Sequence, residues 1–223
     1  MQFSVIIPTL NEATTITPAL QQLLQSIDQS KSVEIIICDG GSRDDTLQQA
    51  QQFPLTLISS PPGRAQQMNT GARMAHGEWL LFLHIDTRLP PHWNAAIESC
   101  TRPWGRFDLR LSGKHWLFRI IEKAINLRSR MTSVATGDQV LFFRRDFFQQ
   151  LGGFAEIPLM EDIAISKRAR QLASPACLSQ QVITSSRRWE QNGILKTVLL
   201  MWSLRFAYWA GIKPERLHRL YYS

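Results

Sequence analysis

A histidine and an aspartate follow an apolar run near the middle of the sequence. The stretch LLFLHIDTRLPP, residues 80–91, begins without charge, places one residue between His84 and Asp86, and ends on two prolines. Such a run is typical of a buried strand that delivers polar side chains to the edge of a sheet. Carboxylate and imidazole groups at such an edge can hold a metal ion or hydrogen-bond a ligand.

Further polar residues come directly after two other apolar runs. Thr9 and Asn11 follow FSVIIP, and Asp39 follows VEIIIC. Both runs are rich in β-branched residues, which favours buried strands. A buried carboxylate without a partner is costly, so Asp39 and Asp86 are either solvated or hold something. Several such residues after predicted strands favour the second alternative.

The first hundred residues alternate between strand and helix patterns. Strands are predicted at residues 3–8, 33–38, 55–59 and 78–85, with helices at 16–27, after Ser42 and at 64–75. Ser42 and Asp45 have the spacing of a capping box for the second helix. The alternation predicts an α/β fold with a Rossmann-like, mostly parallel central sheet and helices on both faces. Ligands bind such sheets at the carboxyl ends of the strands, where these polar residues would meet.

The second half of the sequence is less regular. Residues 106–111 alternate polar and apolar, as a half-exposed strand does, and residues 140–145 form another predicted strand. Helices are predicted at residues 116–127 and 160–173, the latter with acids in its first turn, where the helix dipole favours them. We expect a mixed sheet that extends the parallel one.

The composition is that of one globular domain with a basic surface. The chain has 223 residues, 44% of them hydrophobic and 19% charged, with a net charge of +7 that favours an anionic partner. Its three cysteines are widely spaced, which suggests neither a disulfide framework nor a zinc cluster. The N-terminal MQFSVIIPTL lacks the basic region of a signal peptide, so we expect a cytoplasmic protein. Basic and aromatic residues do not cluster as in a nucleic-acid-binding module, so no nucleic-acid partner is expected.

The C-terminal segment is apolar but carries charges. Residues 194–212, ILKTVLLMWSLRFAYWAGI, contain Lys196 and Arg205 and are short for a bilayer span. One interpretation is an interfacial helix, peripheral on the inner face of the cell membrane, with its aromatic residues at the head groups. The other is a helix that packs on the domain or on a second subunit of a homodimer.

Four stretches together resemble an enzyme family. FSVIIPTLNE, IIICDGGSRDDT, GRAQQMNTGARMAHGEWLLFLHIDT and PLMEDIAISKRAR stand in the order and approximate spacing of the inverting glycosyltransferases of family 2, which have the GT-A fold. LHIDT resembles the LHxDT form of the D-x-D motif in a bacterial subgroup. The resemblance implies transfer of a sugar from a UDP or GDP sugar to a hydroxyl acceptor.

The resemblance also implies a domain organisation. It places a GT-A domain at residues 1–190, followed by a helical segment at 191–223 that associates with membrane or with another subunit. Within the domain, the nucleotide-binding half covers about residues 1–100 and the acceptor half about residues 101–190.

The nucleotide contacts follow from the same motifs. The positions that match base and ribose contacts of the family are Pro8, Thr9, Glu12 and Asp39. An aspartate can accept hydrogen bonds from a nucleobase, which an apolar residue cannot. Arg64 matches a basic position near the nucleotide, where a fixed cation suits phosphate or base. Helix capping is the alternative for Glu12, and a solvated surface position is the alternative for Arg64.

A metal ion is implied at Asp86, which matches the last aspartate of the D-x-D motif. In similar sites this aspartate holds Mg²⁺ or Mn²⁺ against a diphosphate, and one carboxylate can suffice because waters and phosphates complete the shell. His84 stands where many relatives carry aspartate. We expect it to hydrogen-bond the ribose or a neighbouring residue, with metal ligation as the alternative.

The catalytic pair is implied by the ED sequence of Glu161 and Asp162. The aspartate is similar to the family's general base, which deprotonates the acceptor hydroxyl. An inverting transfer needs such a base and a group that stabilises the departing diphosphate. The alternative is that both acids only stabilise a helix N-terminus.

Two motifs resemble acceptor-side or diphosphate-side segments. TGDQ contains Gly137, Asp138 and Gln139, with a plain turn as its alternative. SSRRW contains Arg187, Arg188 and Trp189 and resembles part of the Q-x-x-R-W motif of processive relatives. Ser185 replaces the glutamine of that motif, which favours addition of a single sugar.

The sequence is also compatible with functions other than sugar transfer. The main alternative is a catalytically impaired nucleotide-sugar-binding or membrane-surface module, for which His84 is the best argument. Nucleotidyltransferases need a Gly-rich basic loop after the first strand, and PTLNEATTI offers none. The aromatic and basic residues after Arg187 suggest a lipid or lipid-linked acceptor at a membrane surface.

Overall fold

A single eight-stranded sheet organises the computed structural model, which describes residues 1–222. The strands are β1 (Phe3–Thr9), β2 (Val33–Asp39), β3 (Thr56–Ser59), β4 (Trp79–Phe82), β5 (Thr87–Arg88), β6 (Trp104–Leu111), β7 (Leu141–Arg144) and β8 (Ala176–Thr184). Their order in the sheet is β3-β2-β1-β4-β7-β6-β8-β5. The first four in that order run parallel, and β7 is antiparallel to both β4 and β6. The predicted parallel first half and mixed second half are confirmed.

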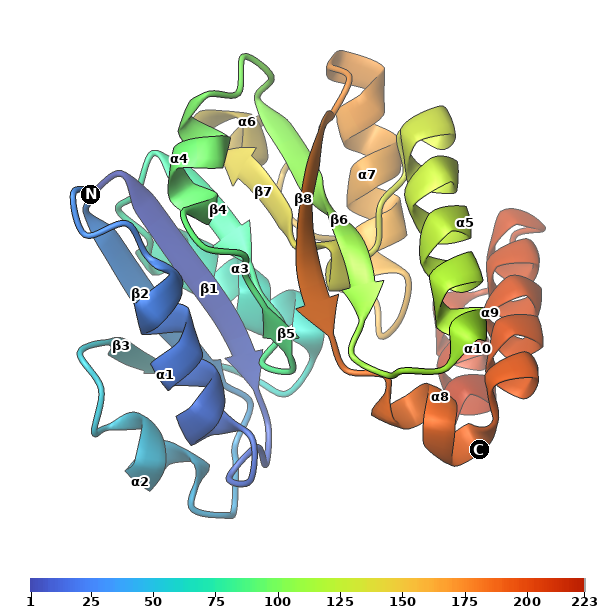
Figure 1. Cartoon of the computed structure of the whole chain (residues 1–223), viewed down its shortest axis with the longest axis horizontal. Coiled ribbons are helices and arrows are strands. Elements are labelled where there is room, and N and C mark those ends of the chain that lie inside the picture. Colours follow the sequence, from blue (N-terminus) through green and yellow to red (C-terminus); the bar gives the residue numbers. More distant parts are fainter. Residues whose placement is uncertain (223) are drawn as a thin grey trace.

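Helices cover both faces of the sheet (Figure 1). They are α1 (Ile16–Ser26), α2 (Thr46–Ala50), α3 (Arg64–Met74), α4 (Trp93–Glu98), α5 (Trp116–Thr132), α6 (Arg145–Gln150), α7 (Glu161–Leu172), α8 (Arg187–Asn192), α9 (Ile194–Trp209) and α10 (Pro214–Tyr222). Helices α1 and α4 pack on one face, and α3, α6 and α7 pack on the other. Helices α5, α9 and α10 stand together beyond β6 and β8 (Figure 1).

The layers follow from the alternation of side chains along each strand. In β1, Phe3, Val5 and Ile7 face α1 and α4, whereas Ile6 faces α3. Helix α3 comes close to the sheet at Gly71, where an added Cβ would lie 2.5 Å from a methyl carbon of Ile6. Only glycine permits this approach, which brings the start of α3 to the strand ends.

The predicted capping box at Ser42 is wrong. Helix α2 begins at Thr46, and the hydroxyl of Ser42 instead donates to a carboxylate oxygen of Asp39. The carboxylate of Asp39 is buried at the end of β2 and needs hydrogen-bond donors. Satisfying this buried carboxylate stabilises the fold more than capping the short surface helix α2 would. At the start of α2, Asp44 instead accepts a hydrogen bond from the backbone amide of Thr46 at 3.1 Å.

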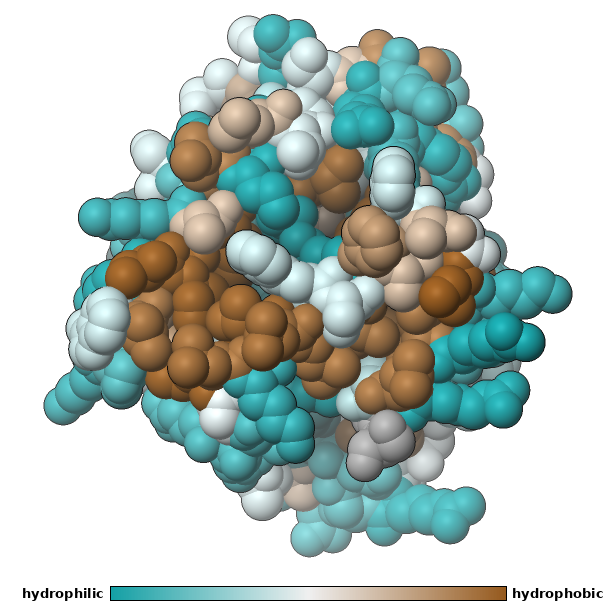
Figure 2. Space-filling model, turned by 90° about the vertical axis from the view of Figure 1, so that its right-hand side faces the viewer, coloured by the Kyte–Doolittle hydropathy of each residue, from teal (hydrophilic) through white to brown (hydrophobic). Residues whose placement is uncertain are grey.

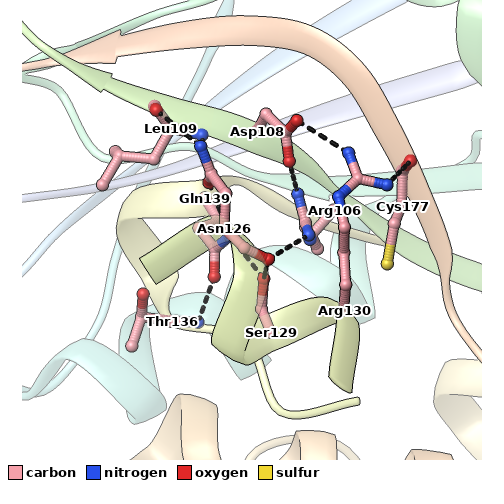
Figure 3. Close-up of polar contacts among 9 residues, drawn as sticks. All are labelled: Arg106, Asp108, Leu109, Asn126, Ser129, Arg130, Thr136, Gln139 and Cys177. Carbon is pink, nitrogen blue, oxygen red and sulfur yellow. Dashed lines mark hydrogen bonds and ion pairs between the residues drawn. The ribbon is translucent and has the colours of Figure 1, made fainter. Parts of the chain in front are cut away.

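The expectation that residues 106–111 are half exposed is also wrong at Arg106. Its side chain is 1% exposed, forms an ion pair with Asp108 and donates to the backbone oxygen of Asn126 at 3.1 Å (Figure 3). Asp108 also pairs with Arg130 of α5 at 2.7 Å. Strand β6 lies between β7 and β8 with α5 against it, so Arg106 and Asp108 are paired internally, whereas Arg110 of the same strand is exposed.

The C-terminal helices pack on the domain. Leu204 of α9 and Leu217 of α10 are buried in a cluster that includes Met160 and Ile163 around the start of α7. Within residues 1–222, no helix combines the length and apolar character needed to cross a bilayer.

Candidate active site

A cavity of about 600 Å³ opens between α5, α9 and the strand-end loops. Polar residues from four separate segments line its inner end, namely Arg64, His84, Asp138, Glu161 and Asp162. Five predicted site residues that are far apart in the sequence therefore meet in one place. The side walls are mostly apolar and come from α5 and α9.

Asp162 is held in place by two backbone amides. The amide of Gly137 donates to Oδ2 at 2.9 Å, and the amide of Ile163 donates to Oδ1 at 2.7 Å. Each carboxylate oxygen keeps a further lone pair for another donor. Because Asp162 also lines the cavity, its carboxylate is positioned to accept a proton from a molecule bound there.

Glu161 is turned inward beside it. Its side chain is buried, and Oε1 lies 3.5 Å from Nη1 of Arg64. Burial raises the pKa of Glu161 and the charge of Asp162 adds to this, while Arg64 opposes the shift. The ion pair between Arg64 and Glu161 joins the first residue of α3 to the first residue of α7. This contact favours a structural role for Glu161, which holds the two helix starts together.

His84 lies against the Gly137–Gln139 turn. Its Nδ1 is 3.5 Å from Oδ1 of Asp138, and a Cβ added at Gly137 would lie 2.6 Å from its Cε1. The side chain of Asp138 is 55% exposed, and the hydrogen bond and charge of His84 lower the pKa of its carboxyl. His84 therefore has Asp138 as a protein partner, which agrees with the expectation that it hydrogen-bonds a neighbouring residue.

The backbone is strained next to the Gly137–Gln139 turn and next to Glu161. Val140, directly after the Gly137–Gln139 turn, has φ of 51°, and Met160, directly before Glu161, has φ of 72°. Positive φ is costly for a β-branched or bulky residue and persists only where the surrounding structure enforces it. The tertiary structure thus imposes the geometry around Asp162.

Gln139 faces away from the cavity. Its side chain is buried, donates to the hydroxyl of Ser129 at 3.0 Å and completes a capping box with Thr136 (Figure 3). The predicted placement of Gln139 on the acceptor side is thus corrected to a buried support of the turn. The reason is that the turn carries its two other polar members, Thr136 and Asp138, toward the cavity instead.

The predicted nucleotide rim lies at the ends of β1 and β2. Asp39 accepts hydrogen bonds from the amides of Gly41 and Ser42 at 2.8 and 2.9 Å, so it orders its own loop. Pro8 is half-buried at the end of β1. The hydroxyl of Thr9 is buried, and no residue in the described range hydrogen-bonds it. An orphaned hydroxyl at this edge suits a ligand that brings its own polar atoms.

Glu12 and Asp86 form an acidic pair near this rim. Burial raises the pKa of Glu12, and the nearby charge of Asp86 raises it further, while Arg187 lowers it. Asp86 itself is exposed in the loop after β4. Across residues 1–222, no three His, Cys, Asp or Glu side chains form a metal-binding group. The carboxylates of Glu12 and Asp86 are oxygen donors of the kind that hard cations bind.

The SSRRW segment divides between two places. The guanidinium of Arg188 lies 3.7 Å above the ring of Tyr221 and donates to its backbone oxygen at 3.3 Å, which ties α8 to α10. Trp189 lines the cavity. Arg187 is exposed, and its charge lowers the pKa of Glu12. Trp189 thus belongs to the cavity wall, whereas Arg188 is a structural contact between helices.

Two cavity residues were missed from the sequence. Arg128 of α5 and Arg205 of α9 both line the cavity, and Nη2 of Arg128 is buried without a hydrogen-bond partner in the described residues. Burial and the neighbouring Arg205 lower the pKa of Arg128 to about 10. A lone arginine within an apolar helix is the signal that could have identified Arg205.

The comparison with protein families gives one match. Residues 4–148 match the model described as Glycosyl transferase family 2, which covers β1 to β7.

Curated relatives agree with this match. The chain is 35% identical over 91 residues to an uncharacterized glycosyltransferase of Haemophilus influenzae, a stretch that covers 40% of this chain and 30% of that protein. It is 36% identical over 94 residues to the PGL/p-HBAD biosynthesis glycosyltransferase of Mycobacterium bovis, covering 39% of this chain and 36% of that protein. The matched stretch thus spans about a third of the length of these relatives.

Solved structures share the fold. S. aureus TarS 1-349 in complex with UDP-GlcNAc superposes with a TM-score of 0.67 at 23% identity, covering 83% of this chain and 58% of that chain. The mannosyltransferase PcManGT from Pyrobaculum calidifontis, in complex with GDP-Man and Mn²⁺, gives a TM-score of 0.62 at 20% identity, covering 82% and 56%. The expected GT-A fold is confirmed.

Proposed function

The chain belongs to glycosyl transferase family 2, and from that premise we propose that it transfers a single sugar from a nucleotide diphosphate sugar to an acceptor hydroxyl. The solved relatives that hold UDP-GlcNAc and GDP-Man support a nucleotide sugar as the donor.

The carboxylate of Asp162 carries the proposal. It is fixed by two amides and faces a cavity, so it can take the proton of an acceptor hydroxyl as that oxygen attacks the sugar. The predicted donor rim lies at the ends of β1 and β2, and the cavity extends from His84, after the neighbouring strand β4, to α5 and α9. Attack from the cavity side, opposite the departing diphosphate, is a single displacement and inverts the anomeric centre.

The departing diphosphate needs stabilisation at the rim. Asp86, with Glu12 beside it, would hold Mg²⁺ or Mn²⁺, and the Mn²⁺ in PcManGT supports a divalent ion. The ion would neutralise the charge that develops on the leaving diphosphate. Arg187 is exposed near Glu12 and would add a positive charge on the same side. His84 positions the Gly137–Gln139 turn through Asp138.

Calorimetry with a panel of UDP and GDP sugars, each with and without Mn²⁺, tests the donor. We expect at least one donor to bind more tightly with Mn²⁺, and NMR of the product to show an inverted anomeric carbon. Metal-independent binding without any transfer or hydrolysis would instead favour the catalytically impaired binding module. A product with a retained anomeric configuration would overturn the single displacement.

A further inference from the structure

We propose that the cavity between α5 and α9 binds the hydrocarbon chain of an amphiphilic acceptor, whose acidic head group lies at Arg128 and Arg205. The acceptor hydroxyl would then lie at Asp162, so this inference rests on the proposed function. It names the class of acceptor as a lipid with a hydroxyl and an acidic group in its head.

The walls of the cavity set the chemistry of its occupant. They include Leu117, Ile121 and Ile125 from α5, and Ile194, Val198 and Met201 from α9. A free sugar or another fully polar acceptor would lose hydration against these walls without gaining hydrogen bonds. A hydrocarbon chain gains free energy there in proportion to the apolar area that it buries. A cavity of about 600 Å³ has room for part of a chain together with a head group.

The apolar lining continues onto the surface. Ile120, Leu195 and Trp202 belong to the cavity wall and are also 54%, 68% and 70% exposed. Apolar residues gather on this face, which contains α5 and α9 (Figure 2). A chain longer than the cavity can therefore leave it over an apolar surface. Exposed patches of this kind mark binding sites more often than chance.

The charge of the inner cavity favours an acidic head group. Arg128 and Arg205 are both half-buried, and burial lowers the pKa of each guanidinium, while the charge of Asp162 acts in the opposite direction on both. Nη2 of Arg128 is also buried without a hydrogen-bond partner in that range. Two desolvated cations side by side suit an anion that brings several acceptor oxygens.

The donor diphosphate is a poor candidate for this anion. The predicted donor residues Arg64 and His84 come from the start of α3 and the loop after β4, whereas Arg128 and Arg205 come from α5 and α9, which stand beyond β6 and β8 (Figure 1). In a single displacement the attacking and leaving groups lie on opposite sides of the sugar. The anion at the two arginines therefore belongs to the acceptor.

Quenching of tryptophan fluorescence by lysophosphatidylglycerol with a brominated acyl chain tests the inference, since Trp189 and Trp202 line the cavity. We expect saturable quenching below the micelle concentration, with affinity rising about fourfold for each added methylene. Glycerol phosphate, the head group alone, should not compete at matched concentrations. A monoacylglycerol of the same chain should bind about tenfold or more weakly, because it lacks the phosphate.

A matched pair of variants locates the site. Ala124→Trp fills the cavity from an exposed position of α5, and Leu127→Trp places the same side chain on α5 outside the cavity. We expect Ala124→Trp to weaken lipid binding about tenfold or more and Leu127→Trp to leave it unchanged. Leu127→Trp should also hydrolyse a nucleotide sugar at the wild-type rate, because Leu127 does not line the cavity.

Three outcomes would overturn the inference while leaving the proposed function intact. They are donor hydrolysis without lipid binding, equal loss of binding in both variants, and a dimer that buries this face and dissociates in Ala124→Trp. Lipid binding without any donor binding or hydrolysis would instead overturn the proposed function.

Discussion

The backbone amide of Gly137 donates a 2.9 Å hydrogen bond to Oδ2 of Asp162, which joins the turn before β7 to the first turn of α7. The same turn touches His84 on its other side. The carboxylate proposed as the base is therefore positioned by a segment 25 residues away in the sequence.

Asp162→Asn should abolish sugar transfer while preserving donor binding. The amide oxygen can still accept from Gly137, but it cannot take a proton, so we expect transfer to fall about a hundredfold to ten-thousandfold. The rate of nucleoside diphosphate release with acceptor present measures this, alongside calorimetry with the donor. Asp45→Asn, an exposed carboxylate outside the site, is the control. Full residual transfer would rule out Asp162 as the base.

Gly137→Ala should slow transfer through His84. The added Cβ would lie 2.6 Å from Cε1 of His84, so either the ring or the turn must move and displace the amide bound to Asp162. In the double variant with His84→Ala the clash is gone, and we expect a coupling energy of about 1 kcal/mol or more in the transfer rate. Strictly additive effects in this double-mutant cycle would show that the two residues act independently.

Asp86→Ala should remove the effect of the metal on donor affinity. Its carboxylate is exposed, so the fold should tolerate the change, but the proposed ion loses its ligand. In the wild type, EDTA should suppress transfer and Mn²⁺ or Mg²⁺ should restore it. Donor titrations of the variant should be the same with and without Mn²⁺. A metal effect of wild-type size in the variant would place the ion elsewhere.

Glu161→Gln should change how stability depends on pH. Burial raises the pKa of Glu161 in the folded protein, so the folded state binds this proton more tightly than the unfolded state. The stability from the protonated form is present below the ordinary glutamate pKa of about 4.3 and is lost as pH rises through the folded value. The variant has no proton to lose at this position. The difference between its free energy of unfolding and that of the wild type should therefore increase in the variant's favour as pH rises. Urea denaturation from acid to neutral pH measures the difference, and a constant difference would contradict the raised pKa.

Asp108→Ala should destabilise the protein far more than Arg130→Ala. The first change leaves Arg106, which is 1% exposed, without its carboxylate, and we expect a loss of about 3 kcal/mol. Arg130 is 40% exposed, so its ion pair with Asp108 should contribute less than about 1 kcal/mol. Urea denaturation of both variants checks the order. Similar losses in the two would mean that Arg106 finds another partner.

Much of the sheet edge that carries the proposed donor side could be predicted from the sequence, because local patterns determine its strands. The apolar runs that end at Thr9, Asp39 and Phe82 form central strands, and their carboxyl ends share one edge. Periodicity alone was sufficient there, since these strands are buried on both faces.

The remaining parts depend on tertiary contacts. Strand β8 (Ala176–Thr184) was not predicted because its middle residues Ser179, Gln180 and Gln181 are exposed, and its pairing with β6 is irregular. Arg106 was expected at the surface because the sequence cannot show that Asp108 pairs with it internally. Arg128 and Arg205 lie 77 positions apart, and only helix packing brings them to one cavity.

The family match ends at residue 148, before α7 and α9 begin. One wall of the cavity is therefore built by a part of the chain that lies outside the shared pattern, while the donor rim lies inside it. With the acceptor in this cavity, as we propose, acceptor choice can diverge among relatives through α9 without changes to the proposed nucleotide-binding residues. Exchanging the segment from residue 193 onward between two relatives is a direct way to exchange their acceptor preference.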